Sequence, residues 1–200
     1  MKYIQSTLLT SSLLAALTLP AYSAENEQNF AIRFGGVLAD PTSNSTILGE
    51  NSEFDSAAGA ELDFEWYFKP NWGLDLSSVG ATDVRYENHG RDVGISMSTF
   101  TVGVNYHPVR TPNLDWSIGL LLGRVSYGDF VIDDNTVFAS VEDDMAYGFQ
   151  TSVDISPKSW EHWAFNLGVK YLNSSAEFAG TVGEVNVDPL IWRAMIVYRW

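Results

Sequence analysis

The sequence predicts an all-β fold, an eight-stranded antiparallel transmembrane β-barrel with short periplasmic turns and longer extracellular loops. Three observations predict it. Segments of about ten residues alternate between apolar and polar side chains, the period of a strand with two different faces. The connections between these segments are alternately long and short. Charged residues make up 18% of the chain and aromatic residues 14%, which is typical of a barrel whose outer face contacts lipid.

The N-terminal segment has the features of a secretory signal peptide. Lys2 supplies the positive charge, and an apolar stretch too short to span a bilayer follows it. Small residues then allow cleavage after Ser23, or else after Ala24. We therefore expect residues 1–23 to be a signal peptide and residues 24–200 to be the outer-membrane barrel. No later run is long enough for a transmembrane helix, so membrane embedding would not be helical.

The composition excludes several classes of function. The chain has no cysteine, which excludes disulfides and thiolate chemistry. Its formal charge of −14 makes nucleic acid an implausible partner, because phosphate binding needs basic side chains. We expect neither a metal nor a cofactor.

The first two predicted strands show both faces of such a barrel. Residues 29–39 alternate, with large apolar side chains on one face. Residues 57–68 have the clearest alternation in the chain, and Glu61, Asp63 and Glu65 share one face. In a membrane barrel these acids point into the lumen.

The next five predicted strands are residues 72–80, 95–106, 114–127, 144–155 and 162–172. Each has an apolar or aromatic outward face and a smaller or more polar inward face. The outward positions include Trp72, Leu74, Leu76, Phe100, Val102, Val104, Trp116, Ile118, Leu120, Leu122, Tyr147, Phe149, Phe165 and Leu167.

The closing strand, within residues 185–200, is the strongest indication of a membrane location. Its outward face is wholly apolar and aromatic: Leu190, Trp192, Ala194, Ile196, Tyr198 and Trp200. Soluble proteins seldom end in this way, because termini are usually frayed and polar. We expect Trp200 to lie at the membrane interface and to be the contact for the barrel-assembly machinery.

The connections agree with this topology. Long polar loops are predicted at residues 40–55, 81–94, 128–143 and 173–184, and short turns at 69–71, 107–113 and 156–161. The short turns contain Pro70, Pro108, Pro112 and Pro157, so no proline interrupts a predicted strand centre. Aromatic residues gather near the short-turn ends as one girdle: Trp66, Phe68, Trp72, Tyr106, Trp116, Trp163, Tyr198 and Trp200.

A soluble lipocalin-like barrel with its apolar face inside is the alternative fold. It would place the acids of the second strand in water. It does not explain the aromatic girdle or the terminal Trp200.

The inward residues divide by depth into two groups. The lower and middle lumen is predicted to hold a charge plug of Arg33, Glu61, Asp63, Glu65, Asp75, Asp154, Lys170, Arg193 and Arg199. Buried charges must be paired, since an unpaired charge costs several kcal/mol. These residues either fill and specify the barrel, which we favour, or conduct ions.

The second group lies toward the outer end and is apolar. It would line a pocket open to the outside: Val37, Val79, Met97, Leu121, Val125, Leu172 and Ile191. The alternative is ordinary packing, because a narrow barrel either holds a small ligand or is filled by its own side chains.

Short motifs give the chain a family resemblance. Val187-Asp188-Pro189 followed by Tyr198-Arg199-Trp200 is similar to the Leu-Asp-Pro…Tyr-Arg-Phe ending of the outer-membrane protein W (OmpW) family. Ile32-Arg33-Phe34-Gly35…Asp40-Pro41 is similar to its start. The segment 116–123 lacks the family's usual Pro-Tyr-Val-Gly-Ala-Gly run. The chain therefore resembles a divergent OmpW member or a neighbouring family of small barrels.

The resemblance implies passive uptake of small hydrophobic molecules, which enter an apolar extracellular-side pocket and leave sideways through the wall. Pro41 and Pro189 flank the seam between the first and last strands, and each lacks an N–H. They mark a candidate lateral exit. The alternative is that prolines are commonplace at strand ends.

Two other classes of function compete with transport. An enzyme would need a nucleophile beside a base, but His89 is predicted in a loop and His107 and His162 in periplasmic turns. A structural or surface-interaction barrel would use the acidic loops, which fit no defined calcium loop. The partners we expect are outer-membrane lipid, lipopolysaccharide and a small hydrophobic solute, in the bacterial outer membrane.

Overall fold

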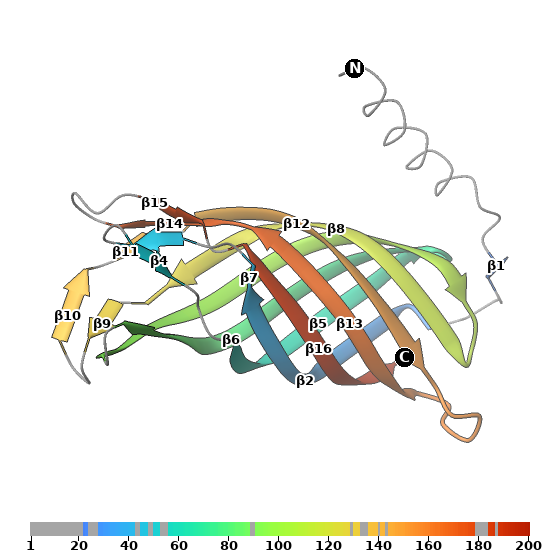
Figure 1. Ribbon diagram of the computed structural model, residues 1–200. Coiled ribbons are helices and arrows are strands. Elements are labelled where there is room, and N and C mark those ends of the chain that lie inside the picture. The colour runs from blue at the N-terminus through green and yellow to red at the C-terminus, as the bar shows by residue number, and fades with distance from the viewer. Residues whose placement is uncertain are drawn as a thin grey trace, which may run out of the picture.

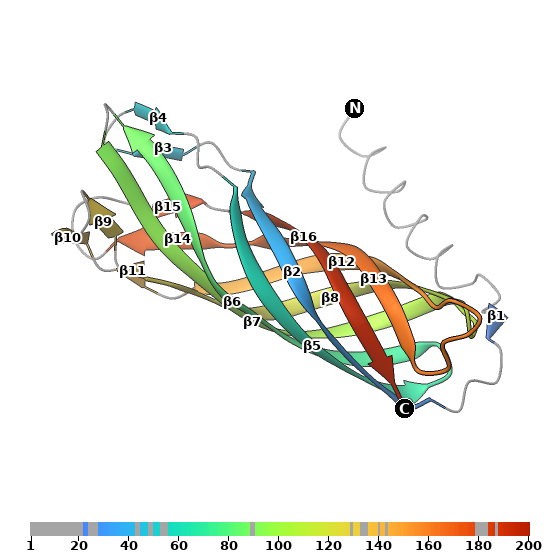
Figure 2. The same cartoon turned by 90° about the horizontal axis from the view of Figure 1, so that it is seen from below.

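Eight strands of the computed structural model close into an antiparallel barrel (Figures 1 and 2). They are β2 (Phe30–Pro41), β5 (Ala57–Lys69), β6 (Trp72–Asn88), β7 (Arg91–Arg110), β8 (Leu114–Tyr127), β12 (Asp144–Ile155), β13 (Trp163–Asn173) and β16 (Pro189–Arg199). Each pairs with the next, and β16 pairs with β2 to close the wall. The predicted fold class is confirmed.

The structure describes residues 22–23, 28–42, 45–47, 50–52, 56–88, 91–128, 130–132, 136–139, 141–142, 144–178, 184–186 and 188–200. Most of the predicted signal peptide lies outside these residues, and so do six acidic positions of the predicted loops: Glu53, Asp55, Asp129, Asp133, Asp134 and Asp143. Tyr22–Ser23 forms the short strand β1, parallel to β7. Among the described residues, no helix is long and apolar enough to cross a membrane.

Short strands interrupt three of the four predicted long loops. They are β3 (Ser45–Ile47), β4 (Glu50–Ser52), β9 (Phe130–Ile132), β10 (Thr136–Ala139), β11 (Val141–Glu142), β14 (Ser175–Phe178) and β15 (Glu184–Asn186). Figure 1 shows them gathered at one end of the barrel, while the C-terminus and the short turns lie at the other. The predicted alternation of long and short connections is therefore present, although these loops are not purely irregular.

The predicted loop at residues 81–94 is wrong. Strand β6 continues to Asn88 and β7 begins at Arg91, with Asn88 opposite Arg91 in the register. A register shift between Val79 and Thr82 separates this outer hairpin from the barrel proper. The segment is polar, but strand pairing needs only backbone groups and tolerates polar side chains on both faces once the strands leave the bilayer.

The predicted turn at residues 107–113 is also too long. Strand β7 runs to Arg110, so His107 and Pro108 lie within it and the turn is only residues 111–113. The ladder with β8 shifts register between Tyr106 and Val109. A bulge at this point accommodates Pro108, which has no N–H to donate to a regular ladder.

The side chains are distributed inside out relative to a soluble protein. Leu120 and Leu167 on the outer face are 70% and 60% exposed, whereas Asp63 and Glu65 on the inner face are fully buried. The predicted girdle residues Trp66, Trp163 and Trp200 are also outward and exposed. This arrangement is stable only if lipid covers the outer wall.

Candidate functional site

Arg33 is the centre of the polar network that fills the lower lumen. Its Nη1 lies 2.9 Å from Oδ1 of Asp63, and its Nη2 lies 2.7 Å from Oε2 of Glu65 and 3.1 Å from Oδ2 of Asp154. The register explains the first contact, because Arg33 on β2 is directly opposite Asp63 on β5. Asp154 reaches the same guanidinium from β12, on another side of the lumen.

Two more basic residues of the network come from the closing strand β16. Arg193 Nη1 lies 3.0 Å from Oδ2 of Asp63 and 3.3 Å from Oε1 of Glu61. Arg199 Nη2 donates to Oδ2 of Asp154 at 2.8 Å. These side-chain contacts connect β16 to β5 and β12 across the lumen. They add to the backbone pairing of β16 with β2 in the barrel wall.

Lys170 and Asp75 complete the predicted set. Lys170 Nζ pairs with Glu61 and donates to Ser77 Oγ at 2.6 Å. Asp75 Oδ1 accepts from Nε2 of Gln150 at 3.1 Å. All nine residues predicted for the charge plug are buried in the lumen: Arg33, Glu61, Asp63, Glu65, Asp75, Asp154, Lys170, Arg193 and Arg199.

His107 also belongs to this network, although the sequence predicted it in a periplasmic turn. Its Nε2 lies 2.9 Å from Oε1 of Glu65 and its Nδ1 lies 2.6 Å from Oδ1 of Asp115. The imidazole therefore bridges a carboxyl group of β5 and one of β8 on the lumen side of the wall. The sequence could have indicated this position for His107. Pro108 follows a long alternating run, and a proline at that place is compatible with a bulge in a continuing strand.

Arg110, also predicted in the turn, covers the periplasmic floor of the lumen. Its guanidinium carbon lies 3.7 Å from the centre of the Tyr67 ring. It donates to the carbonyl oxygens of Pro70 at 2.9 Å and Gln28 at 2.6 Å. Gln28 in turn donates from Nε2 to the carbonyl of Glu161 at 3.0 Å, so the segment before β2 crosses the barrel mouth.

The described lumen contains six buried carboxyl groups, on Glu61, Asp63, Glu65, Asp75, Asp115 and Asp154, and five buried arginine and lysine side chains, on Arg33, Arg110, Lys170, Arg193 and Arg199, together with His107. Asp75 is bonded to Gln150, and each of the other five carboxyl groups lies within 4 Å of a basic side chain. Paired groups leave little residual field to attract a passing ion. The arrangement therefore favours a structural plug over an ion path.

The seven residues predicted to line an upper pocket are also on the lumen face. Val37, Val79, Met97, Leu121, Val125, Leu172 and Ile191 are all buried. Val37 lies opposite Arg193 in the β2–β16 ladder, at the upper edge of the charge plug. Val37 is also the only one of the seven that lines the hollow described next.

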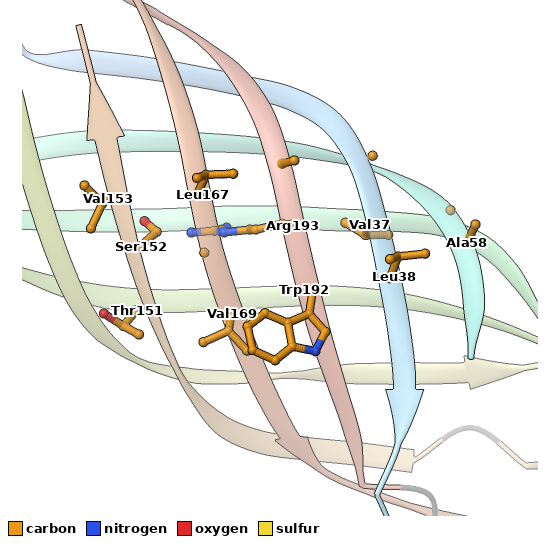
Figure 3. A pocket seen from close by; sticks show the side chains of 14 residues that line it. Val37, Leu38, Ala58, Thr151, Ser152, Val153, Leu167, Val169, Trp192 and Arg193 are labelled. Atoms are coloured by element: carbon orange, nitrogen blue, oxygen red, sulfur yellow. The ribbon is translucent and has the colours of Figure 1, made fainter. Parts of the chain in front are cut away.

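A hollow of about 740 Å³ lies on the wall formed by β12, β13, β16, β2 and β5 (Figure 3). We call it the wall hollow. Its lining includes two parallel rows of lipid-facing residues that follow the register from strand to strand. One row is Thr151, Val169, Trp192, Leu38 and Ala58, and the other is Val153, Leu167, Ala194 and Gly36. The sequence analysis did not predict this feature.

Small residues on both faces of the wall create the wall hollow. A Cβ added to Gly36 would meet nothing within 4 Å, so the space outside β2 is open there. On the lumen face, a Cβ at Gly168 would lie 2.7 Å from Nε of Arg193 and from Cβ of Ser152. Gly36 therefore leaves space on the outer face of β2, and Gly168 leaves room on the lumen face of β13 for Arg193 and Ser152.

The predicted seam residues are opposite each other. The β2–β16 ladder runs without a register shift from Ala31 and Arg199 to Pro41 and Pro189. Phe30 and Trp200 exchange two backbone hydrogen bonds, so the alternation of an antiparallel ladder places Pro41 and Pro189 at a pair that makes none, where their missing N–H groups cost the seam nothing. The connection beyond it is made by Thr42, whose Oγ1 donates to the carbonyl of Asp188 at 2.7 Å.

Comparison with known proteins gives a clear result for the fold only. No family model and no curated sequence matches the chain. Among solved structures, OprG from Pseudomonas aeruginosa has a TM-score of 0.68 at 20% identity, over 86% of this chain and 96% of that chain. AlkL in lipid bilayers has a TM-score of 0.60 at 18% identity, over 90% and 94% of the two chains. OmpW from E. coli has a TM-score of 0.55 at 16% identity, over 88% and 100%.

These neighbours are outer-membrane proteins, which supports the predicted location in the bacterial outer membrane. The likeness in fold agrees with the resemblance of the sequence motifs to the OmpW family. In fold, the chain is an eight-stranded barrel similar to those of OmpW, OprG and AlkL.

Proposed function

We propose that this barrel is a passive conduit for small hydrophobic molecules, which enter the upper lumen from outside and leave sideways into the membrane. The observation that carries the proposal is the wall hollow, an apolar depression at the closing seam. The wall hollow lies at the same height along the barrel as the upper edge of the charge plug. Val37 and Arg193, which are opposite each other at that edge, both belong to the lining of the wall hollow.

The charge plug supports a lateral exit. A solute that entered along the axis would meet Arg193, Glu61 and Asp63, which are paired and fully or almost fully buried. Passing an apolar solute through them would require breaking buried ion pairs, each of which costs about 3–5 kcal/mol when one partner is lost. The outer face of the wall at Gly36 carries no side chain, so the obstacle on that face is the backbone ladder.

The upper lumen supports an apolar cargo. Its seven buried residues, from Val37 to Ile191, offer no charge to a solute. Placing Asp at Leu121 or Ile191 would desolvate a carboxylate in this region, so we expect uptake of an apolar solute to be lost while the barrel remains folded. Leu121→Met is the matched control because it conserves volume and polarity.

The exit can be tested separately by filling the wall hollow. Gly36→Leu places a side chain in the open space outside β2, and we expect uptake to fall several-fold. Gly80→Leu is the control, because Gly80 also faces outward but does not line the wall hollow. A Cβ there meets only the carbonyl oxygen of Ala60, at 3.5 Å.

Uptake is measured with a small apolar fluorophore, N-phenyl-1-naphthylamine, in vesicles whose outer leaflet contains lipopolysaccharide. Equal uptake by wild type, Leu121→Asp and Ile191→Asp would remove the conduit and leave a structural or surface-interaction barrel. Loss of uptake in the Asp variants with no effect of Gly36→Leu would keep the conduit and reject the wall hollow as its exit.

A further inference from the structure

Asp188 has an unusual backbone conformation at the start of the closing strand. Its φ is +38°, in the left-handed region, and no other non-glycine residue in the described part of the chain has a positive φ. This conformation is unfavourable for residues with a Cβ, although Asp and Asn tolerate it best. A residue stays there only when its surroundings hold it.

Contacts on two sides hold Asp188 in place. Its Oδ1 accepts from Nδ2 of Asn173 at 2.9 Å and from the backbone N–H of Ser174 at 3.1 Å, at the outer end of β13. Its carbonyl oxygen accepts from Oγ1 of Thr42 at 2.7 Å and, at a longer 3.4 Å, from the Thr42 N–H, at the outer end of β2. One residue therefore joins the ends of three strands, β13, β16 and β2.

The contact between Thr42 and Asp188 is the outermost hydrogen-bonded position of the described β2–β16 seam. Phe30 and Trp200 exchange two backbone hydrogen bonds, and hydrogen-bonded pairs alternate with non-bonded pairs along the unshifted ladder. Pro41 and Pro189 therefore occupy a non-bonded pair, and Thr42 and Asp188 the bonded position beyond it. Without the bonds from Thr42, the last bonded pair would be Asp40 and Leu190, and the strands could separate from that end inward.

We propose that Asp188, with Asn173, Ser174 and Thr42, forms a latch that sets how far the outer end of the β2–β16 seam opens. The carboxylate fixes the left-handed backbone, and that backbone aims the carbonyl at Thr42. Asp188 thus acts as a positioning residue, through the strands it joins and not by contact with a solute. Its effect on uptake rests on the lateral exit proposed above, whereas its effect on the seam does not.

Three variants separate the parts of the latch. Asp188→Gly adopts the left-handed conformation without strain but has no carboxylate. Asp188→Asn tolerates the conformation and keeps an oxygen acceptor. Asn173→Ala removes one of the two donors to the carboxylate.

The primary measurement is amide hydrogen exchange by NMR in detergent micelles. In Asp188→Gly we expect exchange at Leu190 to Trp192 and Leu38 to Asp40 to accelerate roughly tenfold or more, because two hydrogen bonds to a charged group are lost. Asn173→Ala should give a smaller acceleration, and Asp188→Asn should stay near wild type. The lower seam, near Ala31 and Arg199, should not change in any variant.

Uptake of N-phenyl-1-naphthylamine is the second measurement, and we expect it to rise several-fold in Asp188→Gly. Unchanged exchange at the outer seam in that variant would overturn the latch, whatever happens to uptake. Faster exchange with unchanged uptake would overturn the control of uptake by Asp188 and, with it, the seam as the exit. Loss of uptake in Leu121→Asp would still show that the barrel conducts.

Discussion

Replacing Arg33 by Met is the most direct test of how the lower lumen is stabilised. The side chain is 2% exposed and donates to three carboxylates, those of Asp63, Glu65 and Asp154. Each carboxylate keeps another partner: Asp63 keeps Arg193, Glu65 keeps His107 and Asp154 keeps Arg199. None of the three is left wholly unpaired, but the plug loses the charge at its centre.

We expect Arg33→Met to lower the free energy of unfolding by about 3–5 kcal/mol, the range for removing one partner of a buried ion pair. Arg33→Lys keeps the charge, but its three donors share one nitrogen and cannot span three carboxylates as the planar guanidinium does. We therefore expect it to lose about 1.5–3 kcal/mol, the contribution of a hydrogen bond to a charged group. Lys69→Met, at an exposed strand end, should change stability by less than about 0.5 kcal/mol.

Reversible urea unfolding from lipid vesicles, followed by tryptophan fluorescence, measures these differences. The Arg33→Met loss should also be insensitive to salt, because buried pairs are screened much less than exposed ones. A loss within about 0.5 kcal/mol of the Lys69→Met control would refute the reasoning. It would mean that water in the lumen solvates the three carboxylates as well as the arginine does.

Three further predictions follow from single contacts. Leu120→Arg places a cation on the lipid face, where Leu120 is 70% exposed. It should lower the stability of the barrel in vesicles by about 2–4 kcal/mol, the cost of a cation near the middle of the bilayer. Gly148→Ala drives a Cβ into the carbonyl oxygen of Tyr171 and should cost about 1–3 kcal/mol, whereas Gly36→Ala should be near neutral; urea midpoints compare the two. His107→Phe removes the bridge between Glu65 and Asp115 and should cost about 3–5 kcal/mol, and an effect below about 1 kcal/mol would show that the remaining arginine partners of the two carboxyl groups suffice.

The alternation of side chains predicted most of the fold because period two specifies which face of each strand is buried. Glu61, Asp63 and Glu65 could be assigned to the lumen from spacing alone, and the structure places them there. Their arginine partners followed from strand order, since the first, second and last strands adjoin in any closed barrel of this kind. These properties depend only on neighbours along or across the sheet.

Strand ends were less predictable. The polar residues beyond Gly80 gave no sign that β6 and β7 would stay paired outside the bilayer, because a solvated hairpin needs no apolar face. Pro108 predicts a turn, but a bulge accommodates this proline within β7. His107, the residue before it, therefore lies on the lumen face and contacts Glu65. A register shift is a property of two strands together and leaves little trace in either one.

The wall hollow illustrates the same limit. Gly36, Ala58 and Ala194 are unremarkable small residues when each strand is considered separately. They become one depression only when the register across several strands is known, and an error of one residue in a strand would turn its side chains to the opposite face. The Asp188 latch likewise depends on a backbone dihedral angle that no pattern of side chains specifies.

The pairing of β2 with β16 has a consequence for biosynthesis. The carbonyl of Trp200 accepts from the N–H groups of Asn29 and Phe30 at 2.9 and 3.0 Å, and the Trp200 ring stacks on that of Phe30. Strand β2 therefore pairs with its second neighbour only after β16 has been exported. Until then, the exported strands have two unpaired sheet edges, which are templates for aggregation. Those edges need shielding during export until β16 pairs with β2.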